Sequence, residues 1–258
     1  MQVAELFSLD GKVAAVVGGT GVLGGTFCRG LADAGASVAV LGRSAERGAA
    51  VVAELERAGH RALTVSVDAT EREQLEAAER CIVERLGGVD ILVNAAGINS
   101  TTPFFDLQQE EWHRILDTNL TSTMLACQVF ARRMVDRGRG GCIINISSDS
   151  SEIPLSKVLT YGVSKAGVNN LTRYLARELA PYRIRVNALL PGFFPAEQNR
   201  RILAPERVEA ILRHTPLGRL GEPEELVGAI VWLASERAAG FVTGALICVD
   251  GGFSAMTI

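Results

Sequence analysis

Short apolar segments rich in β-branched residues alternate along this chain with longer segments of helical periodicity, and this alternation limits the possible folds most strongly. The apolar segments are KVAAVVG, ASVAVLG, RALTVSV, VDILVNAA, GCIINIS, IRVNALL and ALICVD. Strands that are separated by helices form a parallel sheet covered by helices on both faces. Because neither a low-complexity linker nor an internal repeat interrupts the 258 residues, we expect one doubly wound α/β domain.

Composition and charge argue against several other classes of protein. The chain is 48% apolar and 21% charged, which fits a large buried core, and its net charge of -3 comes with scattered basic residues that make no stripe for nucleic acid. Its first residues, MQVAELFSLDGK, do not resemble a signal peptide, and no apolar run reaches the roughly 18 residues of a membrane span. The five cysteines include no CxxC pair, so no metal site is expected. We expect a soluble, cytoplasmic protein with a small-molecule partner, which binds neither nucleic acid nor membrane.

A glycine-rich turn, GGTGVLGG, follows the first apolar segment and opens a helix that is expected to run from Val22 to just before Gly35. Glycines in this place let the backbone approach a pyrophosphate, while the helix N-terminus offers free N–H groups. An ordinary tight turn is the alternative for an isolated glycine pattern, but its position between strand and helix favours a dinucleotide site. The residues expected to form it are Gly18, Thr20, Gly21, Val22, Leu23 and Gly24.

The end of the second apolar segment, VAVLGRS, bears on which dinucleotide would bind. An NAD-specific site places a carboxylate here for the ribose hydroxyls, whereas this chain has Gly42 followed by Arg43. The guanidinium of Arg43 could pair with a 2′-phosphate, or it could simply face water. NADP is therefore favoured as the cofactor, and NAD is possible.

The segment YGVSK places Tyr161 and Lys165 four residues apart, on one face of an expected helix from Leu159 to Leu179. A nearby ammonium group should lower the pKa of a tyrosine and make it a proton donor and acceptor. Ser148, directly after GCIINIS, could hold a substrate oxygen near the phenol, with Ser147 as the adjacent competitor. Because no GxSxG turn surrounds these serines, hydrolase chemistry is not indicated.

Together these motifs, with NAAG after VDILV and PG after IRVNALL, resemble the short-chain dehydrogenase/reductase family over nearly the whole chain. The resemblance implies a seven-stranded parallel sheet, a homotetramer or dimer, and hydride transfer between a nicotinamide cofactor and a carbonyl or alcohol carbon. It also implies that Asn119 is a fourth catalytic residue, which holds a water that relays protons towards Lys165. The chain departs from the family at Val17, where a threonine is usual, and at Pro195 and Ala196. Further cofactor contacts that the resemblance implies are Asp68, Asn94, Ala95, Gly97, Tyr161, Lys165, Pro191 and Gly192.

Within the family, segments such as PGFF followed by QNR look similar to mannonate oxidoreductases or fructuronate reductases. A polar, polyhydroxylated substrate such as a sugar acid is expected, because hydrophilic side chains occupy positions that should border the substrate pocket. Arg200 could clamp a carboxylate or face water, within an expected lid at about residues 191–216. The other polar residues in question are Asn99, Asp149, Glu152, Gln198 and Asn199.

Two other functions remain open at this point. One is a regulatory protein that senses a nucleotide on the same fold without turnover, and the other is a lyase or epimerase that uses the same phenol. Net consumption of the reduced cofactor during substrate conversion would distinguish a dehydrogenase from both. The catalytic set expected for the dehydrogenase is Asn119, Ser148, Tyr161 and Lys165.

Overall fold

The computed structural model describes residues 2–194 and 205–256, and its centre is one sheet of seven parallel strands in the order β3-β2-β1-β4-β5-β6-β7. Each strand coincides with one of the seven apolar segments, with β6 extending one residue further to Pro191, so the expected fold class is confirmed. Their repeated β-branched residues suit strands that are buried on both faces. The strands are β1 (Val13–Val17), β2 (Ser37–Gly42), β3 (Ala62–Ser66), β4 (Ile91–Asn94), β5 (Gly141–Ile146), β6 (Ile184–Pro191) and β7 (Leu246–Val249).

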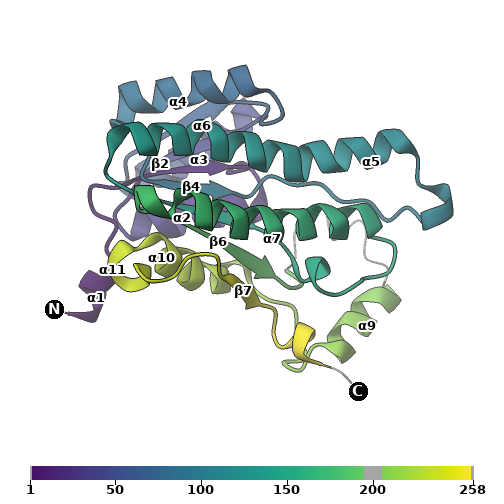
Figure 1. Cartoon of the computed structure of the whole chain (residues 1–258). Helices are drawn as coiled ribbons and strands as arrows, with labels where there is room; N and C mark the ends of the chain where they lie inside the picture. The colour runs from purple at the N-terminus through teal and green to yellow at the C-terminus, as the bar shows by residue number, and fades with distance from the viewer. Residues whose placement is uncertain (1, 195–204, 257–258) are drawn as a thin grey trace.

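Helices cover both faces of the sheet (Figure 1). Helices α2, α3 and α10 pack on one face around Phe27, and α4, α6 and α7 pack on the other around Phe130. Each of these phenylalanines is fully buried, which stabilises the fold by roughly 1.5–3 kcal/mol per side chain. No helix among the described residues is both long and apolar enough to cross a membrane. The helices are α1 (Val3–Leu6), α2 (Val22–Asp33), α3 (Ala45–Arg57), α4 (Arg72–Leu86), α5 (Gln109–Leu116), α6 (Ser122–Arg137), α7 (Leu159–Leu179), α9 (Pro205–His214), α10 (Val227–Ala234) and α11 (Glu236–Ala239).

The order of the strands decides where a ligand can bind. The chain reverses its winding direction between β1 and β4, and parallel sheets of this kind bind ligands beyond the carboxyl ends of the strands at that point. The glycine turn after β1, the NAAG segment after β4 and the serines after β5 all lie at this edge. Helix α9 lies on the side towards which the β6 arrow points (Figure 1).

The helical periodicity from Glu110 to Arg137 predicts one long helix, but the structure interrupts it. A π-helical turn, Asp117–Thr121, separates α5 from α6. A π-turn makes the local winding wider and often occurs at functional sites. Here it contains Asn119, whose side chain is completely buried. The apolar periodicity on either side gave no sign of this extra winding.

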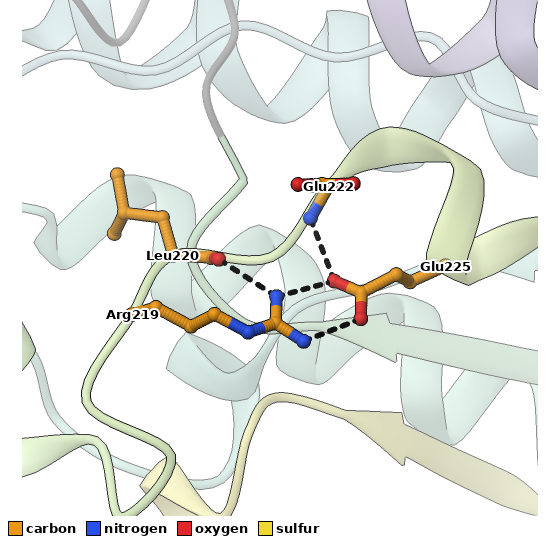
Figure 2. A network of polar contacts seen from close by, with 4 residues as sticks. All are labelled: Arg219, Leu220, Glu222 and Glu225. Atoms are coloured by element: carbon orange, nitrogen blue, oxygen red, sulfur yellow. Dashed lines mark hydrogen bonds and ion pairs between the residues drawn. The ribbon is translucent and has the colours of Figure 1, made fainter.

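The segment that leads into α10 is held by a small surface network (Figure 2). Arg219 donates to both carboxylate oxygens of Glu225, at 2.7 and 2.6 Å, and the backbone N–H of Glu222 donates to the same carboxylate. These bonds lower the pKa of Glu225 to about 2, with the Arg219 hydrogen bond as the largest cause. The network thereby fixes the start of the short helical turn Pro223–Leu226 that precedes α10.

Candidate active site

A cavity of about 1020 Å³ runs along the carboxyl edge of the sheet. It is lined by the segments that follow β1, β2, β3, β4, β5 and β6, and by parts of α5, α7 and α9. A volume of this size is at the upper end of small-molecule sites and leaves room for an extended ligand. The expected residues that line it are Gly18, Thr20, Gly21, Val22, Leu23, Gly24, Arg43, Asp68, Ala95, Gly97, Asn99, Ser148, Asp149, Tyr161, Lys165, Pro191 and Gly192.

The glycine turn is as tight as the sequence indicated. Gly18 has a φ of +84°, and a Cβ there would lie 2.6 Å from the backbone nitrogen of Ala96. A Cβ on Gly24 would lie 2.1 Å from the carbonyl oxygen of Gly18. Because Gly21 caps α2 without a side-chain hydrogen bond, the first N–H groups of this helix remain free for an anion. These residues fit the pyrophosphate of a dinucleotide.

The end of β2 fits a 2′-phosphate better than a bare ribose. A Cβ on Gly42 would lie only 2.4 Å from Oγ1 of Thr20, so a carboxylate could not stand there without moving that side chain. Arg43 is exposed at the cavity, and two further arginines that the sequence reasoning missed, Arg29 and Arg47, also line it. The sequence does contain a sign that points to Arg47, because Ser44 marks the start of a helix. In the structure Ser44 caps α3, and its hydroxyl accepts a hydrogen bond from the backbone N–H of Arg47.

Asp68 follows β3 at the same end of the cavity. Its carboxylate accepts hydrogen bonds from the backbone N–H and the hydroxyl of Thr70, at 3.0 and 2.7 Å. These bonds lower the pKa of Asp68, and the positive charge of Arg43 adds a smaller effect. The aspartate is therefore held ionised and oriented in the wall of the cavity.

Ser148, Tyr161 and Lys165 meet where β5 ends beside α7. Ser148 is hydrogen-bonded to Tyr161, and the hydroxyl of Ser150 donates to Oγ of Ser148 at 3.0 Å. Nζ of Lys165 donates to the carbonyl oxygen of Ile146 at 2.7 Å and lies 5.6 Å from the centre of the Tyr161 ring. The competing serine, Ser147, donates to the carbonyl oxygen of Lys165 and so ties β5 to α7.

The electrostatics of this group differ from the sequence-based expectation. The pKa of Tyr161 is raised, because burial outweighs the hydrogen bond from Ser148 and the charge of Asp149 adds to the rise. Burial also lowers the pKa of Lys165 to about 8. The expectation that the Lys165 ammonium lowers the pKa of Tyr161 is therefore wrong for the protein without its cofactor, since desolvation dominates both groups.

Two expected site residues lie beneath the cavity instead of lining it. The side chain of Asn119 donates to the carbonyl oxygen of Ile98 and accepts from its N–H, at 2.9 and 2.8 Å, and it also donates to Ser164. It thus joins the β4 loop to α7, and none of these described partners is Lys165. Asn94 is buried and donates to Asn145 of β5 at 2.9 Å. The side chain of Asn94 therefore lies between strands, so that only its backbone is left to contact a cofactor.

The polar residues expected around the substrate have different positions. Asn99 and Asp149 line the cavity, whereas Glu152 is exposed and accepts a hydrogen bond from Asn169.

Sequence reasoning missed Arg114 and Arg207, two cations that line the cavity from α5 and α9. Gln198, Asn199 and Arg200 lie outside the described residues, as does the middle of the expected lid at 191–216. Across the described ranges, no group of three His, Cys, Asp or Glu side chains could hold a metal ion.

Comparison with known proteins identifies the family. A family model described as enoyl-(acyl carrier protein) reductase matches residues 21–254. Gluconate 5-dehydrogenase of Gluconobacter oxydans is 37% identical over 251 residues, with 97% of each chain covered. 3beta-hydroxysteroid dehydrogenase 1 of Eggerthella lenta is 39% identical over 248 residues, with 95% of each covered. The crystal structure of a gluconate 5-dehydrogenase from Burkholderia cenocepacia, in complex with NADP and tartrate, superposes with a TM-score of 0.95 at 35% identity and covers 99% of this chain and 100% of that one.

The chain belongs to the short-chain dehydrogenase/reductase family. It is an NAD(P)-dependent oxidoreductase that transfers a hydride between a nicotinamide cofactor and a carbonyl or alcohol carbon. The expected likeness to mannonate oxidoreductases needs correction, because the relatives with a named sugar-acid activity include gluconate 5-dehydrogenase, 5-keto-D-gluconate 5-reductase and 2-dehydro-3-deoxy-D-gluconate 5-dehydrogenase. Short shared segments such as PGFF did not distinguish these subgroups.

Proposed function

We propose that this enzyme interconverts a keto sugar acid and its hydroxy acid, with a 5-ketogluconate-like substrate and NADPH as the preferred reductant. The observation that carries the proposal is the position of the Ser148–Tyr161 hydrogen bond inside a cavity that also holds the cations Arg114 and Arg207. A bidentate guanidinium suits a substrate carboxylate. The gluconate 5-dehydrogenase relatives support the same class of substrate.

The preference for NADP is supported by the surroundings of β2. Gly42 leaves no room for a ribose-binding carboxylate against Thr20, and Arg43 and Arg47, which follow β2, line the cavity with positive charge, whereas Arg29 is paired with Glu54 at 3.6 Å. Guanidinium groups favour a phosphate over a hydroxyl. The NADP complex of the Burkholderia cenocepacia enzyme agrees with this preference.

The catalytic roles follow from the positions of the side chains. A bound nicotinamide would supply or accept the hydride. In the reductive direction Ser148 holds the carbonyl oxygen by a hydrogen bond, and Tyr161 donates the proton that the developing alkoxide needs. Lys165 places a positive charge beside the ring and is positioned by the Ile146 carbonyl. Asn119 remains a proposed catalytic residue of the proton path. Its side chain joins the loop after β4 to α7, the helix that carries Tyr161 and Lys165.

A substrate panel tests the proposal. It contains 5-keto-D-gluconate, fructuronate, a neutral ketose and a 3-keto steroid, each assayed with NADPH and with NADH by net loss of the reduced cofactor. We expect the highest kcat/KM for a keto sugar acid with NADPH. Turnover confined to the steroid or to hydrophobic ketones would contradict the sugar-acid assignment, and conversion without cofactor loss would favour a lyase or epimerase.

A pair of variants on α9 tests whether the positive charge of Arg207 binds the substrate carboxylate. Arg207→Gln should raise KM for the keto sugar acid about tenfold or more, because it removes a positive charge from the cavity wall. It should leave KM for the neutral ketose nearly unchanged. Arg213→Gln is the matched control, since Arg213 is exposed on the same helix and pairs with Glu209 at 2.9 Å. An equal rise for acid and neutral ketose would show that Arg207 acts on the structure of the cavity wall instead of on the carboxylate.

The assembly and location of the enzyme are also proposals. We infer a homo-oligomer, either a tetramer or a dimer, because α7 exposes the apolar side chains of Leu159, Val163 and Tyr174. Light scattering coupled to size exclusion would measure the number of subunits, and a monomer at micromolar concentration would contradict the inference. A cytoplasmic location is supported by the cofactor and by the buried free thiols of Cys28, Cys127 and Cys142.

A further inference from the structure

Asp149 follows the serine of the catalytic group directly, and its carboxyl group has no hydrogen-bond partner. The residue lines the cavity but is only 2% exposed, and both of its carboxylate oxygens are buried without a partner among the residues that the structure describes. An unpaired buried carboxylate is costly, because its charge loses water and gains nothing in return. A carboxyl group in this position is expected either to hold a proton or to meet a ligand.

The neighbouring carboxyl group of Asp250 indicates that Asp149 holds a proton. A Cβ on Gly192 would lie 3.0 Å from Oδ2 of Asp149 and 2.8 Å from Cβ of Asp250, so this glycine lets the two acids approach across the backbone. Asp250 is well satisfied, since it accepts from the N–H groups of Gly252 and Ser254, at 2.9 and 2.8 Å, and from the Ser254 hydroxyl. The negative charge of the pair therefore resides on Asp250, and the proton resides on Asp149.

The other ionisable groups around Asp149 do not compensate its charge. Tyr161 on α7 and Cys248 on β7 are its neighbours; burial raises the pKa of both, and the charge of Asp149 adds to the rise. Glu152, which follows the short helical turn Asp149–Ser151, is a further acid and accepts a hydrogen bond from Asn169. Burial, followed by the charge of Asp250, raises the pKa of Asp149 to about 7. A proton on Asp149 thus persists close to neutral pH.

We propose that Asp149 is a specificity-determining residue that binds the sugar-acid substrate as a neutral carboxylic acid and donates a hydrogen bond to one of its oxygens beside Ser148. The inference rests on the proposed function, because it assumes an anionic, oxygen-rich substrate. The substrate oxygen supplies the partner that the buried carboxyl group lacks. The ionised form of Asp149 has no proton to donate and repels an anionic substrate, so substrate binding weakens when the proton leaves.

The experiment compares Asp149→Asn with the wild type, using 5-keto-D-gluconate and NADPH between pH 6 and pH 9. Asparagine keeps the size and a donor but cannot ionise. For the wild type, KM should rise by up to about tenfold per pH unit above the midpoint of Asp149. For Asp149→Asn, this steep rise should be lost, and KM at pH 9 should stay within about threefold of its own value at pH 6.

Two controls make the result specific. Asp136→Asn changes an acid of α6 that does not line the cavity, and it should retain the wild-type rise in KM. NADPH affinity, measured directly by its fluorescence, should be equal in wild type and Asp149→Asn at every pH. A pH-dependent difference in NADPH affinity would assign Asp149 to the cofactor and overturn the proposal.

The outcomes separate this inference from the proposed function. If 5-keto-D-gluconate and the other sugar acids are not reduced at all, the proposed function fails and this inference fails with it. If they are reduced and KM rises with pH equally in wild type and Asp149→Asn, only the inference about Asp149 is contradicted. Circular dichroism and thermal unfolding of Asp149→Asn report whether the variant is folded, and Asp149→Ser offers a second neutral donor if it is not.

Discussion

Nζ of Lys165 lies 5.6 Å from the centre of the Tyr161 ring, yet its hydrogen bond goes to the carbonyl oxygen of Ile146. The two side chains are neighbours on α7, but desolvation sets the pKa of each in the free protein. The lysine therefore carries its charge at neutral pH in a place where charge is disfavoured. We infer that the burial of this charge lowers the stability of the protein but places a cation beside the catalytic phenol.

Replacement of this lysine should stabilise the free protein while it abolishes activity. A fall of the pKa from 10.5 to about 8 corresponds to a cost of about 3 kcal/mol when Lys165 is charged. Lys165→Met removes this cost but leaves the Ile146 carbonyl without its donor, which costs about 1–3 kcal/mol. A net gain of up to about 2 kcal/mol at pH 7 is expected in urea unfolding.

The pH dependence of that difference provides the check. Between pH 8 and pH 10.5 the unfolded wild type keeps the Lys165 proton that the folded wild type has lost, so wild-type stability rises relative to Lys165→Met. The difference between the two proteins should therefore shift in favour of the wild type across this interval. A difference that is constant from pH 7 to pH 10 would show that Lys165 is not destabilised by burial.

The two adjacent glycines of α2 offer a matched pair for the cofactor turn. Gly24→Ala would place a Cβ 2.1 Å from the Gly18 carbonyl oxygen, so the turn must open. We expect a loss of NADPH affinity of at least tenfold and a destabilisation of about 1–3 kcal/mol. Gly25→Ala meets its nearest atom at 3.7 Å and should gain about 0.5–1 kcal/mol with normal binding. Equal NADPH affinity of the two variants in a fluorescence titration would contradict this account of the turn.

The arginines near β2 should decide between the two dinucleotides. The double variant Arg43→Ala with Arg47→Ala should raise KM for NADPH by about tenfold or more, as expected for charge-assisted bonds of roughly 1.5–3 kcal/mol. KM for NADH should change little, because NADH carries no 2′-phosphate. Arg57→Gln is the control on the same helix, since Arg57 lies at the far end of α3 and donates to Ala53. A parallel loss for both cofactors would mean that the arginines bind a part common to NADPH and NADH.

The seven strands, helix α7 and the meeting of Ser148 with Tyr161 could be predicted because each depends on local patterns or on the order of parallel strands. The apolar segments marked the strands, and the spacing of Tyr161 and Lys165 marked one face of a helix. The carboxyl ends of neighbouring strands then had to share one edge. These features need no knowledge of side-chain surroundings.

What could not be predicted depends on long-range packing. The burial of Asn94 between β4 and β5, and the π-turn around Asn119, arise from contacts with residues far along the chain. The pKa values of Tyr161 and Lys165 depend on how much water is excluded, which the four-residue spacing does not report. The approach of Asp149 to Asp250 likewise joins segments that are about a hundred residues apart.

The central claim is that the hydroxyl group of Tyr161 transfers the proton in a hydride-transfer reaction, and Tyr161→Phe tests it most directly. This variant keeps the ring and removes only the hydroxyl, so NADPH affinity and thermal stability should stay close to those of the wild type. Loss of general acid catalysis should lower kcat for the best keto acid by a factor of about 10² to 10⁴. A kcat within twofold of the wild type would contradict the claim.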